Sequence, residues 1–170
     1  MDARAEGAGG AAKASPGKEG TYLTFSLAGE EYGVGILKIR EIIGLMAITT
    51  MPKTPDYVKG VINLRGKVIP VIDLRLKFGI EAMAYNDRTC IVVVEIKGTG
   101  TKLSMGIVVD SVSEVLNIKG SEIEETPSFG AKLDTDYILG MAKSSSGVKI
   151  LLDIDRVLNA DEVSSLTQAA

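Results

Sequence analysis

The chain has 170 residues, 45% of them hydrophobic, which is enough for one ordinary domain or two small ones. A net charge of −3 gives no general attraction for a phosphate backbone and argues against nucleic acid as a partner. We find no segment with the length of a membrane span and no signal-peptide pattern at the N-terminus. Aromatic residues make up only 5%, so the core depends on Val, Ile and Leu, a composition that favours strands.

The sequence contains no histidine and a single cysteine, Cys90. The lack of histidine removes the commonest general base and the commonest metal ligand. One thiol cannot form an internal disulfide or a thiolate metal site. Cys90 lies in an apolar run, where a small buried side chain in a reduced, cytosolic protein is expected. We therefore expect no metal, no other cofactor and no enzymatic activity.

The acidic residues with the strongest claim to chemistry are Asp73, Asp153, Glu122, Glu124 and Glu125. The three glutamates lie beside Lys119, which is typical of a solvated turn. Each of the two aspartates ends an apolar run, where a carboxylate commonly caps the next turn. The segment Gly98-Thr99-Gly100 joins two expected strands and lacks the following helix that a phosphate cradle needs.

The N-terminal part of the chain predicts a tail and then a hairpin. Residues 1–19 are rich in Ala, Gly, Lys and Ser, and we expect them to be disordered. Leu23, Phe25 and Leu27 alternate with other residues, which predicts a half-buried strand that returns over 31–34. Residues 35–46 fit both helical and strand spacing, so we expect a helical turn near Ile36–Ile39 followed by a strand.

The segment 60–73 predicts the clearest hairpin of the chain. Two apolar runs flank Arg65-Gly66, which reads as a tight turn with a cation at its exposed tip. Such an arginine suits an interface, although it also fits a merely solvated turn. Both faces of the run 68–72 are apolar, so we expect both to be covered. Pro70 cannot donate to a ladder and is expected at an edge or a bulge.

The second half of the chain predicts further strands. Residues 89–96 are apolar on both faces, and 102–109 alternate. A last hairpin is expected over 137–142 and 148–154. A C-terminal helix follows, with Asn159 as its cap and Glu162 as the capping-box partner.

The sequence contains a weak internal repeat at a spacing of 80 residues. Its matched pairs are Thr21/Thr101, Leu23/Leu103, Ile43/Ile123, Asp56/Asp136, Tyr57/Tyr137, Gly60/Gly140, Val68/Val148 and Asp73/Asp153. These identities are only about twice as frequent as chance, but the register is more telling. A DYxxG motif precedes both hairpins, and both hairpins end in an apolar run closed by Asp. We expect two similar small β-barrels over 21–85 and 86–158, with the helix over 159–168, and each barrel stabilised by packing on the other.

Four segments of the chain form a specific pattern: residues 30–42, the run 55–75 with its NLRG turn and PVIDLR strand, residues 85–87 and residues 106–110. Together they resemble the CheW family of chemotaxis coupling proteins. The resemblance extends from Thr21 to the C-terminus and leaves only the tail unmatched. It implies an all-β fold of two five-stranded SH3-like β-barrels on a shared hydrophobic core, with short helices and a C-terminal helix.

The resemblance also implies a function. CheW-like proteins are non-enzymatic cytoplasmic adaptors that bind the cytoplasmic tips of methyl-accepting chemoreceptors and the regulatory domain of the histidine kinase CheA. They link receptors into arrays and associate with the membrane only through these partners. By position, the resemblance implies a receptor-binding groove at Ile36, Ile39, Glu41, Gly60, Val61, Arg65 and Gly66. It implies a kinase-binding strand at Thr89, Cys90 and Ile91. We expect Glu41 and Arg65 to pair across the rim of the groove.

Two other functions fit parts of the sequence. The first is a regulatory CheW-like module of another two-component signalling complex, such as a receptor fusion or a kinase regulatory domain. The absence of a kinase or response-regulator segment after Ala170 argues against it. The second is a small hydrolase that uses Asp73 or Glu41, which would lack a positioned base.

Overall fold

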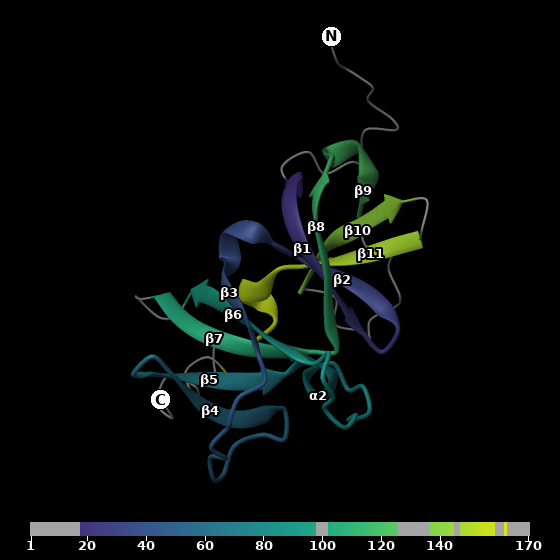
Figure 1. The fold of residues 1–170 in the computed structure, drawn as a ribbon. Helices are drawn as coiled ribbons and strands as arrows, with labels where there is room; N and C mark the ends of the chain where they lie inside the picture. Colours follow the sequence, from purple (N-terminus) through teal and green to yellow (C-terminus); the bar gives the residue numbers. More distant parts are fainter. Residues whose placement is uncertain (1–17, 98–101, 126–136, 145–146, 159–161, 163–170) are drawn as a thin grey trace.

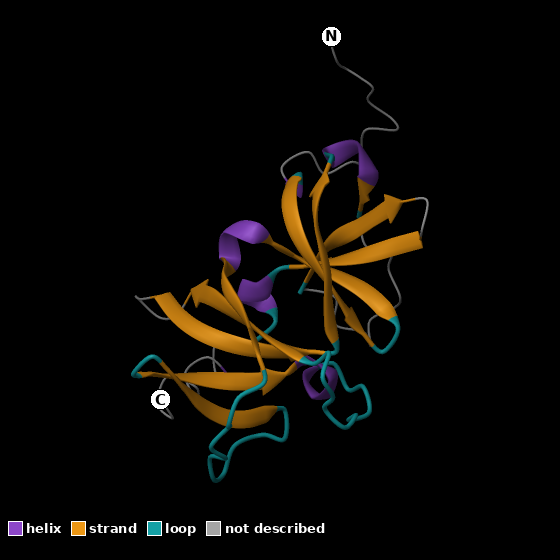
Figure 2. Cartoon of the chain, viewed as in Figure 1, coloured by secondary structure: helices purple, strands orange, loops and turns teal. Residues whose placement is uncertain are grey.

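The computed structural model describes residues 18–97, 102–125, 137–144, 147–158 and 162. In these residues the strands form two curved sheets, which Figures 1 and 2 show as separate bodies joined by crossing segments. The six-stranded sheet has the order β8 (Ser111–Ile118), β1 (Gly20–Leu27), β2 (Glu30–Gly35), β11 (Gly147–Leu152), β10 (Ile138–Ser144), β9 (Ile123–Glu124). The five-stranded sheet has the order β3 (Ile39–Gly44), β6 (Cys90–Lys97), β7 (Lys102–Val109), β5 (Lys67–Asp73), β4 (Val58–Leu64). Short helices connect them: η2 (Ile36–Lys38), α2 (Leu74–Lys77), η3 (Gly120–Glu122) and η4 (Ile154–Arg156).

The five-stranded sheet curls around an apolar interior of its own. The chain after β3 comes back to β4, where two backbone hydrogen bonds form. The Thr49 N–H donates to the Val61 carbonyl at 2.8 Å, and the Val61 N–H donates to the Thr49 carbonyl at 2.9 Å. This bridge brings the two edges of the sheet together, so that the sheet closes into a barrel. The buried interior residues are Ile62, Ile69, Val71, Ile91, Val93 and Val108.

The six-stranded sheet encloses a second, smaller interior, and a third cluster joins the two barrels. The second interior contains Tyr22, Ile118, Ile123, Ala142 and Leu151. Strand β6 shows how the third cluster arises, because Val92, Val94 and Ile96 point away from the interior of their own barrel and into the shared core. Both faces of β6 are therefore buried, as its composition predicted. The all-β fold of two barrels on a shared hydrophobic core is confirmed, with β9 as a sixth strand on one of them.

The sheets divide the strands differently from the expected boundary between residues 85 and 86. Strands β6 and β7 belong to the five-stranded sheet, whereas β1 and β2 belong to the six-stranded one. Position by position, the order β3-β6-β7-β5-β4 corresponds to β8-β1-β2-β11-β10, so each half of the chain gives its first hairpin to the other barrel. The two parallel pairings, β5 with β7 and β2 with β11, hold the exchanged hairpins in place. Local pattern predicts hairpins but not which sheet they join, which is why the boundary was misplaced.

The later part of the internal repeat is reproduced in atomic detail. The Asp73 N–H donates to the backbone carbonyl of Tyr57 at 2.8 Å, and the Asp153 N–H donates to the backbone carbonyl of Tyr137 at 2.8 Å. Both aspartate side chains also cap the next turn, as predicted, by accepting from the N–H two residues on. The earliest matches are not equivalent in space, because Leu23 lies in β1 and Leu103 in β7, while strand order makes β6 the counterpart of β1.

Other expectations for single segments have mixed outcomes. The outer face of β5 is not fully covered, since Val68 is 48% exposed near the tip of the hairpin. Pro70 pairs with Val61 on β4, and the ladder to β7 begins only at Val71. The proline therefore lies at the end of one ladder of an inner strand, and not at the expected sheet edge or bulge. Glu122 belongs to η3, but Glu124 lies in β9 rather than in a solvated turn.

The two ends of the chain fall mostly outside the described residues. Of the expected tail over 1–19, only Lys18 and Glu19 are described, and of the expected helix over 159–168, only Glu162. Asn159, its expected cap, is outside the described part. The Glu162 carboxylate contacts the Lys77 ammonium at 2.7 Å and accepts a hydrogen bond from the Tyr57 hydroxyl.

Candidate functional site

An ion pair between Glu41 and Arg65 spans the two edges of the five-stranded barrel. Arg65 is at the tip of the β4–β5 hairpin, where φ is 51° at Arg65 and 87° at Gly66. Positive φ at both central residues is the geometry that matches the twist of a two-residue hairpin. The Asn63 side chain supports the turn by accepting from the Gly66 N–H at 2.8 Å. The guanidinium donates to both carboxylate oxygens of Glu41 on β3, so the expected pair is present.

This ion pair forms the rim of a surface groove of about 240 Å³. The apolar lining comes from Leu64, Ile69 and Val93, and the polar lining from Arg40, Glu41, Arg65, Lys67 and Ser104. The hydrogen bond from Arg65 holds the pKa of the Glu41 carboxyl below its usual range, so this carboxylate is ionised at neutral pH. An apolar floor with a charged, mainly cationic rim is suited to a protein segment that combines apolar and acidic side chains.

The structure separates the other predicted receptor residues from this groove. Ile36 and Ile39 are half-buried and pack against the shared core. Gly60 and Val61 lie at the seam where the chain after β3 meets β4. Gly60 has φ of 140°, and a Cβ there would lie 2.0 Å from the Thr49 oxygen. Its role is therefore to let two backbone segments approach each other closely.

The three predicted kinase-facing residues differ in their exposure. Thr89 and Ile91 are buried, and Ile91 belongs to the interior of the five-stranded barrel. The Thr89 hydroxyl accepts from the Asn86 N–H at 2.9 Å and so stabilises the turn before β6. Cys90 is partly exposed and is the one member of this group whose side chain offers surface.

Several exposed apolar residues lie near these positions and were not predicted from the sequence. Leu37, in η2, is 94% exposed, and Ile42, Leu45 and Met46 are also exposed in β3 and the segment after it. Gly44 pairs with Cys90, so this apolar segment runs past the exposed part of the β6 strand. The feature of the sequence that indicates them is the long apolar stretch 42–48. Because this stretch fits both helical and strand spacing, its sequence does not predict which side chains point outward.

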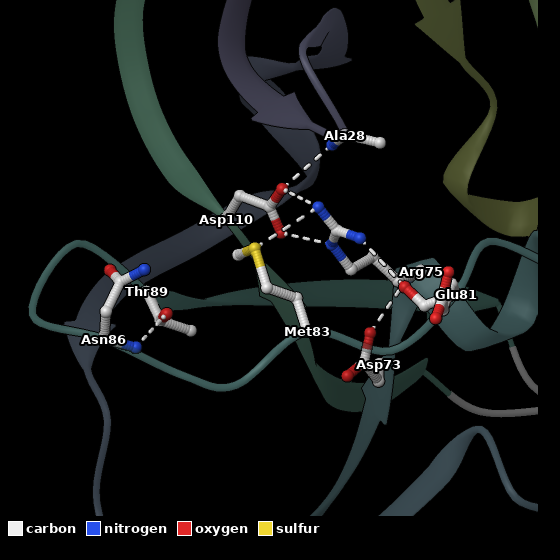
Figure 3. A network of polar contacts seen from close by, with 8 residues as sticks. All are labelled: Ala28, Asp73, Arg75, Glu81, Met83, Asn86, Thr89 and Asp110. Atoms are coloured by element: carbon white, nitrogen blue, oxygen red, sulfur yellow. Dashed lines mark hydrogen bonds and ion pairs between the residues drawn. The ribbon is translucent and has the colours of Figure 1, made fainter.

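A polar network lies where the two barrels meet, as Figure 3 shows. The Arg75 guanidinium donates to both carboxylate oxygens of Asp110 and to the backbone carbonyl of Glu81, each at 2.8 Å. The Asp73 carboxylate accepts from the Arg75 N–H at 2.9 Å and from the Tyr85 hydroxyl at 2.8 Å. Burial and this hydrogen bond together raise the pKa of Tyr85. Both oxygens of Asp73 are thus occupied, and its role is structural.

No group of acidic or cysteine side chains within the described residues has the arrangement of a metal site. None of the described helices has the length and apolar composition that a membrane crossing needs. The described part of the chain is a two-barrel module with a groove and an exposed apolar segment, which is the architecture of a protein-binding module.

Comparisons with known proteins agree with this class. A family model for the CheW-like domain matches residues 21–162. The chain is 39% identical over 149 residues to the chemotaxis protein CheW of Klebsiella aerogenes, a match that covers 88% of this chain and 87% of that one. It is 31% identical over 144 residues to the chemotaxis protein CheW of Bacillus subtilis, covering 84% and 89%. The crystal structure of the scaffolding protein TtCheW from Thermoanaerobacter tengcongensis matches with a TM-score of 0.73 and 35% identity, covering 85% of this chain and 90% of that chain.

The chain therefore belongs to the CheW family of chemotaxis proteins.

Proposed function

We propose that this chain is a non-enzymatic adaptor that couples methyl-accepting chemoreceptors to the histidine kinase CheA and helps assemble receptor arrays. The observation that carries the proposal is the groove of the five-stranded barrel, whose rim is the Glu41–Arg65 pair. A receptor helix would lay its apolar residues on the groove floor and its acidic residues on the cationic rim. Membership of the CheW family supports the same role.

An adaptor needs a second surface for its second partner. We place the kinase-binding surface at the exposed part of β6 near Cys90, together with the exposed Leu45 and Met46. In this arrangement the buried Thr89 and Ile91 do not contact the kinase. They support the surface, because Thr89 stabilises the turn before β6 and Ile91 anchors the strand in the barrel interior. Strand β3 connects the two surfaces, because it carries Glu41 and leads directly into Leu45 and Met46, so that a partner on one surface can stabilise the other.

The proposal includes action in the cytoplasm, contact with the membrane only through the receptors, and no cofactor. It also includes the absence of catalysis. The two acidic groups that a hydrolase would use are both engaged, Asp73 by two hydrogen bonds and Glu41 by Arg65. Neither has a neighbouring histidine to act with, since the sequence contains none.

Reconstitution of a receptor cytoplasmic fragment, the kinase and this chain tests the proposal. We expect the chain to change kinase autophosphorylation in a receptor-dependent way, and Arg65→Glu to remove most of that change. Arg156→Glu is the matched control, because the Arg156 side chain is 65% exposed against 69% for Arg65 and also pairs with a carboxylate. A wild-type chain without effect rejects the adaptor role. A normal effect from Arg65→Glu rejects only the assignment of the groove.

A further inference from the structure

The six-stranded barrel has a pocket at the position that corresponds to the groove of the five-stranded one. This pocket, of about 170 Å³, lies between β8 and the β10–β11 hairpin. The groove lies between β3 and the β4–β5 hairpin, and strand order makes β3 the counterpart of β8 and the two hairpins counterparts of each other. The two sites can therefore be compared residue by residue.

The comparison places Lys149 where the other barrel has Ile69. The spacing of 80 residues that relates Asp73 to Asp153 also relates Ile69 to Lys149. Lys149 is two residues before Leu151 on β11 and pairs with Ala142 on β10, so its side chain points to the barrel interior that both of these residues fill. It lines the pocket and is only 7% exposed.

The Lys149 ammonium has no counter-ion within the described part of the chain. Three carboxylates on neighbouring elements have other partners: Glu124 pairs with Lys143, the Glu122 carboxylate accepts from the Lys119 N–H at 2.8 Å, and Glu31, opposite Lys149 on β2, accepts from the Ser113 hydroxyl at 3.1 Å. No hydrogen bond or ion pair joins the Lys149 ammonium to another described residue, although its backbone lies in the sheet between β10 and β2. A buried ammonium without a partner is costly, and an anion that enters the pocket would offset that cost.

We propose that this pocket binds the carboxylate of a glutamate side chain from a partner protein. One free ammonium matches a carboxylate with a single charge, and Glu122 on the pocket wall disfavours a dianion such as phosphate. The apolar lining from Leu116, Ile118 and Ala142 suits the methylene groups of glutamate.

A neighbouring apolar pocket favours a protein partner over a free small acid. Lys143 lines both pockets, and the second one, of about 300 Å³, is also lined by Met141 and the exposed Val148, with Glu124 and Glu125 as its acidic residues. A segment that places a glutamate in the first pocket would bring an adjacent apolar side chain to the second. This inference does not depend on the proposed coupling of receptors to a kinase.

Nuclear magnetic resonance of the full, isotope-labelled chain tests the proposal. The probes are N-acetylglutamate amide, the neutral N-acetylglutamine amide and inorganic phosphate. We expect the glutamate compound to shift the side-chain resonances of Lys149 and the backbone amides of Leu116 and Ala142, and the neutral compound to leave them unchanged. We expect Lys149→Met to weaken binding about tenfold or more, since it removes the lysine of the pocket that has no counter-ion among the described residues.

Two variants separate binding from folding. Lys149→Met is expected to fold and to melt at a higher temperature, because its counterpart Ile69 is also an apolar core residue. Lys143→Met, which changes a lysine on the rim, should bind the glutamate compound as the wild-type chain does. The proposal is overturned by stronger binding of phosphate, by equal binding of the neutral compound, by unchanged binding in Lys149→Met, or by no shift at Lys149. If Lys149→Met does not fold, the wild-type comparison of the three probes decides by itself.

Discussion

Arg75 and Asp110 form a two-point ion pair in which both nitrogen–oxygen distances are 2.8 Å (Figure 3). Arg75 lies in α2, directly after a strand of the five-stranded sheet, and Asp110 lies where the chain leaves that sheet for β8. The Asp110 carboxylate also accepts from the Ala28 N–H at 2.8 Å, in the turn between β1 and β2. One carboxylate thus joins the two barrels at the points where their hairpins are exchanged.

Removing either member of this pair should destabilise the fold. The two side chains are only 13% and 18% exposed, so the remaining partner would be left largely buried without its counter-charge. We predict that Asp110→Asn and Arg75→Met each lower the free energy of unfolding by about 2–4 kcal/mol, measured by urea denaturation. The control is Glu95→Gln, which breaks the pairs with the more exposed Arg40 and Lys102 side chains and should cost less than about 1 kcal/mol. Equal losses in all three variants would contradict a special role for the pair.

The same carboxylate should make stability depend on acid. The hydrogen bond from Arg75 and the one from Ala28 hold the pKa of Asp110 below its usual range, although burial opposes them. The usual value for an aspartate is about 3.9, so this contribution is fully present above about pH 4. It is lost as the pH falls through the lowered pKa of the folded state. We predict that below about pH 4 the melting temperature of the wild-type chain falls more steeply than that of Asp110→Asn. Parallel curves of melting temperature against pH for the two chains would contradict the prediction.

The close approach at Gly60 leads to a prediction about backbone packing. A Cβ at this position would lie 2.0 Å from the Thr49 oxygen, with φ at 140°. We predict that Gly60→Ala lowers the free energy of unfolding by about 2–4 kcal/mol, because the seam of the barrel must open. Gly44→Ala is the control, since a Cβ there meets nothing within 4 Å and φ is not positive. Urea denaturation of both variants measures the difference, and a Gly60→Ala chain as stable as Gly44→Ala would contradict the prediction.

Features that depend on a few neighbouring residues were predictable from the sequence. The Arg65-Gly66 turn, the caps at Asp73 and Asp153 and the two-faced burial of β6 all follow from local spacing and residue type. The Glu41–Arg65 contact required the resemblance as well, because 24 residues separate the two side chains and only the closure of the barrel brings them together.

Features set by distant pairing were not predictable in the same way. The exchange of hairpins rests on the parallel ladders of β5 with β7 and of β2 with β11, whose partners are far apart in the chain. Lys149 is a similar case, since an alternating strand predicts which residues share a face but not that a lysine lies on the inner one. The place of β6 between β3 and β7 is set in the same way, because no local pattern specifies the neighbours of a strand.

Variants of the Glu41–Arg65 pair can distinguish two roles of Arg65: holding the shape of the groove, and contacting the partner protein directly. Both side chains are accessible to solvent, so Arg65→Glu should leave the melting temperature nearly unchanged while it impairs kinase coupling. Exchanging the charges, with Glu41→Arg and Arg65→Glu together, restores an attractive pair across the rim but reverses its direction. We predict that the double variant recovers part of the receptor-dependent kinase activity, because the pair holds the hairpin tip against β3. Autophosphorylation and thermal melting of the two single variants and the double variant test this. Wholesale unfolding of Arg65→Glu would show that the pair is needed for the fold, and no recovery in the double variant would show that Arg65 acts by contacting the partner itself.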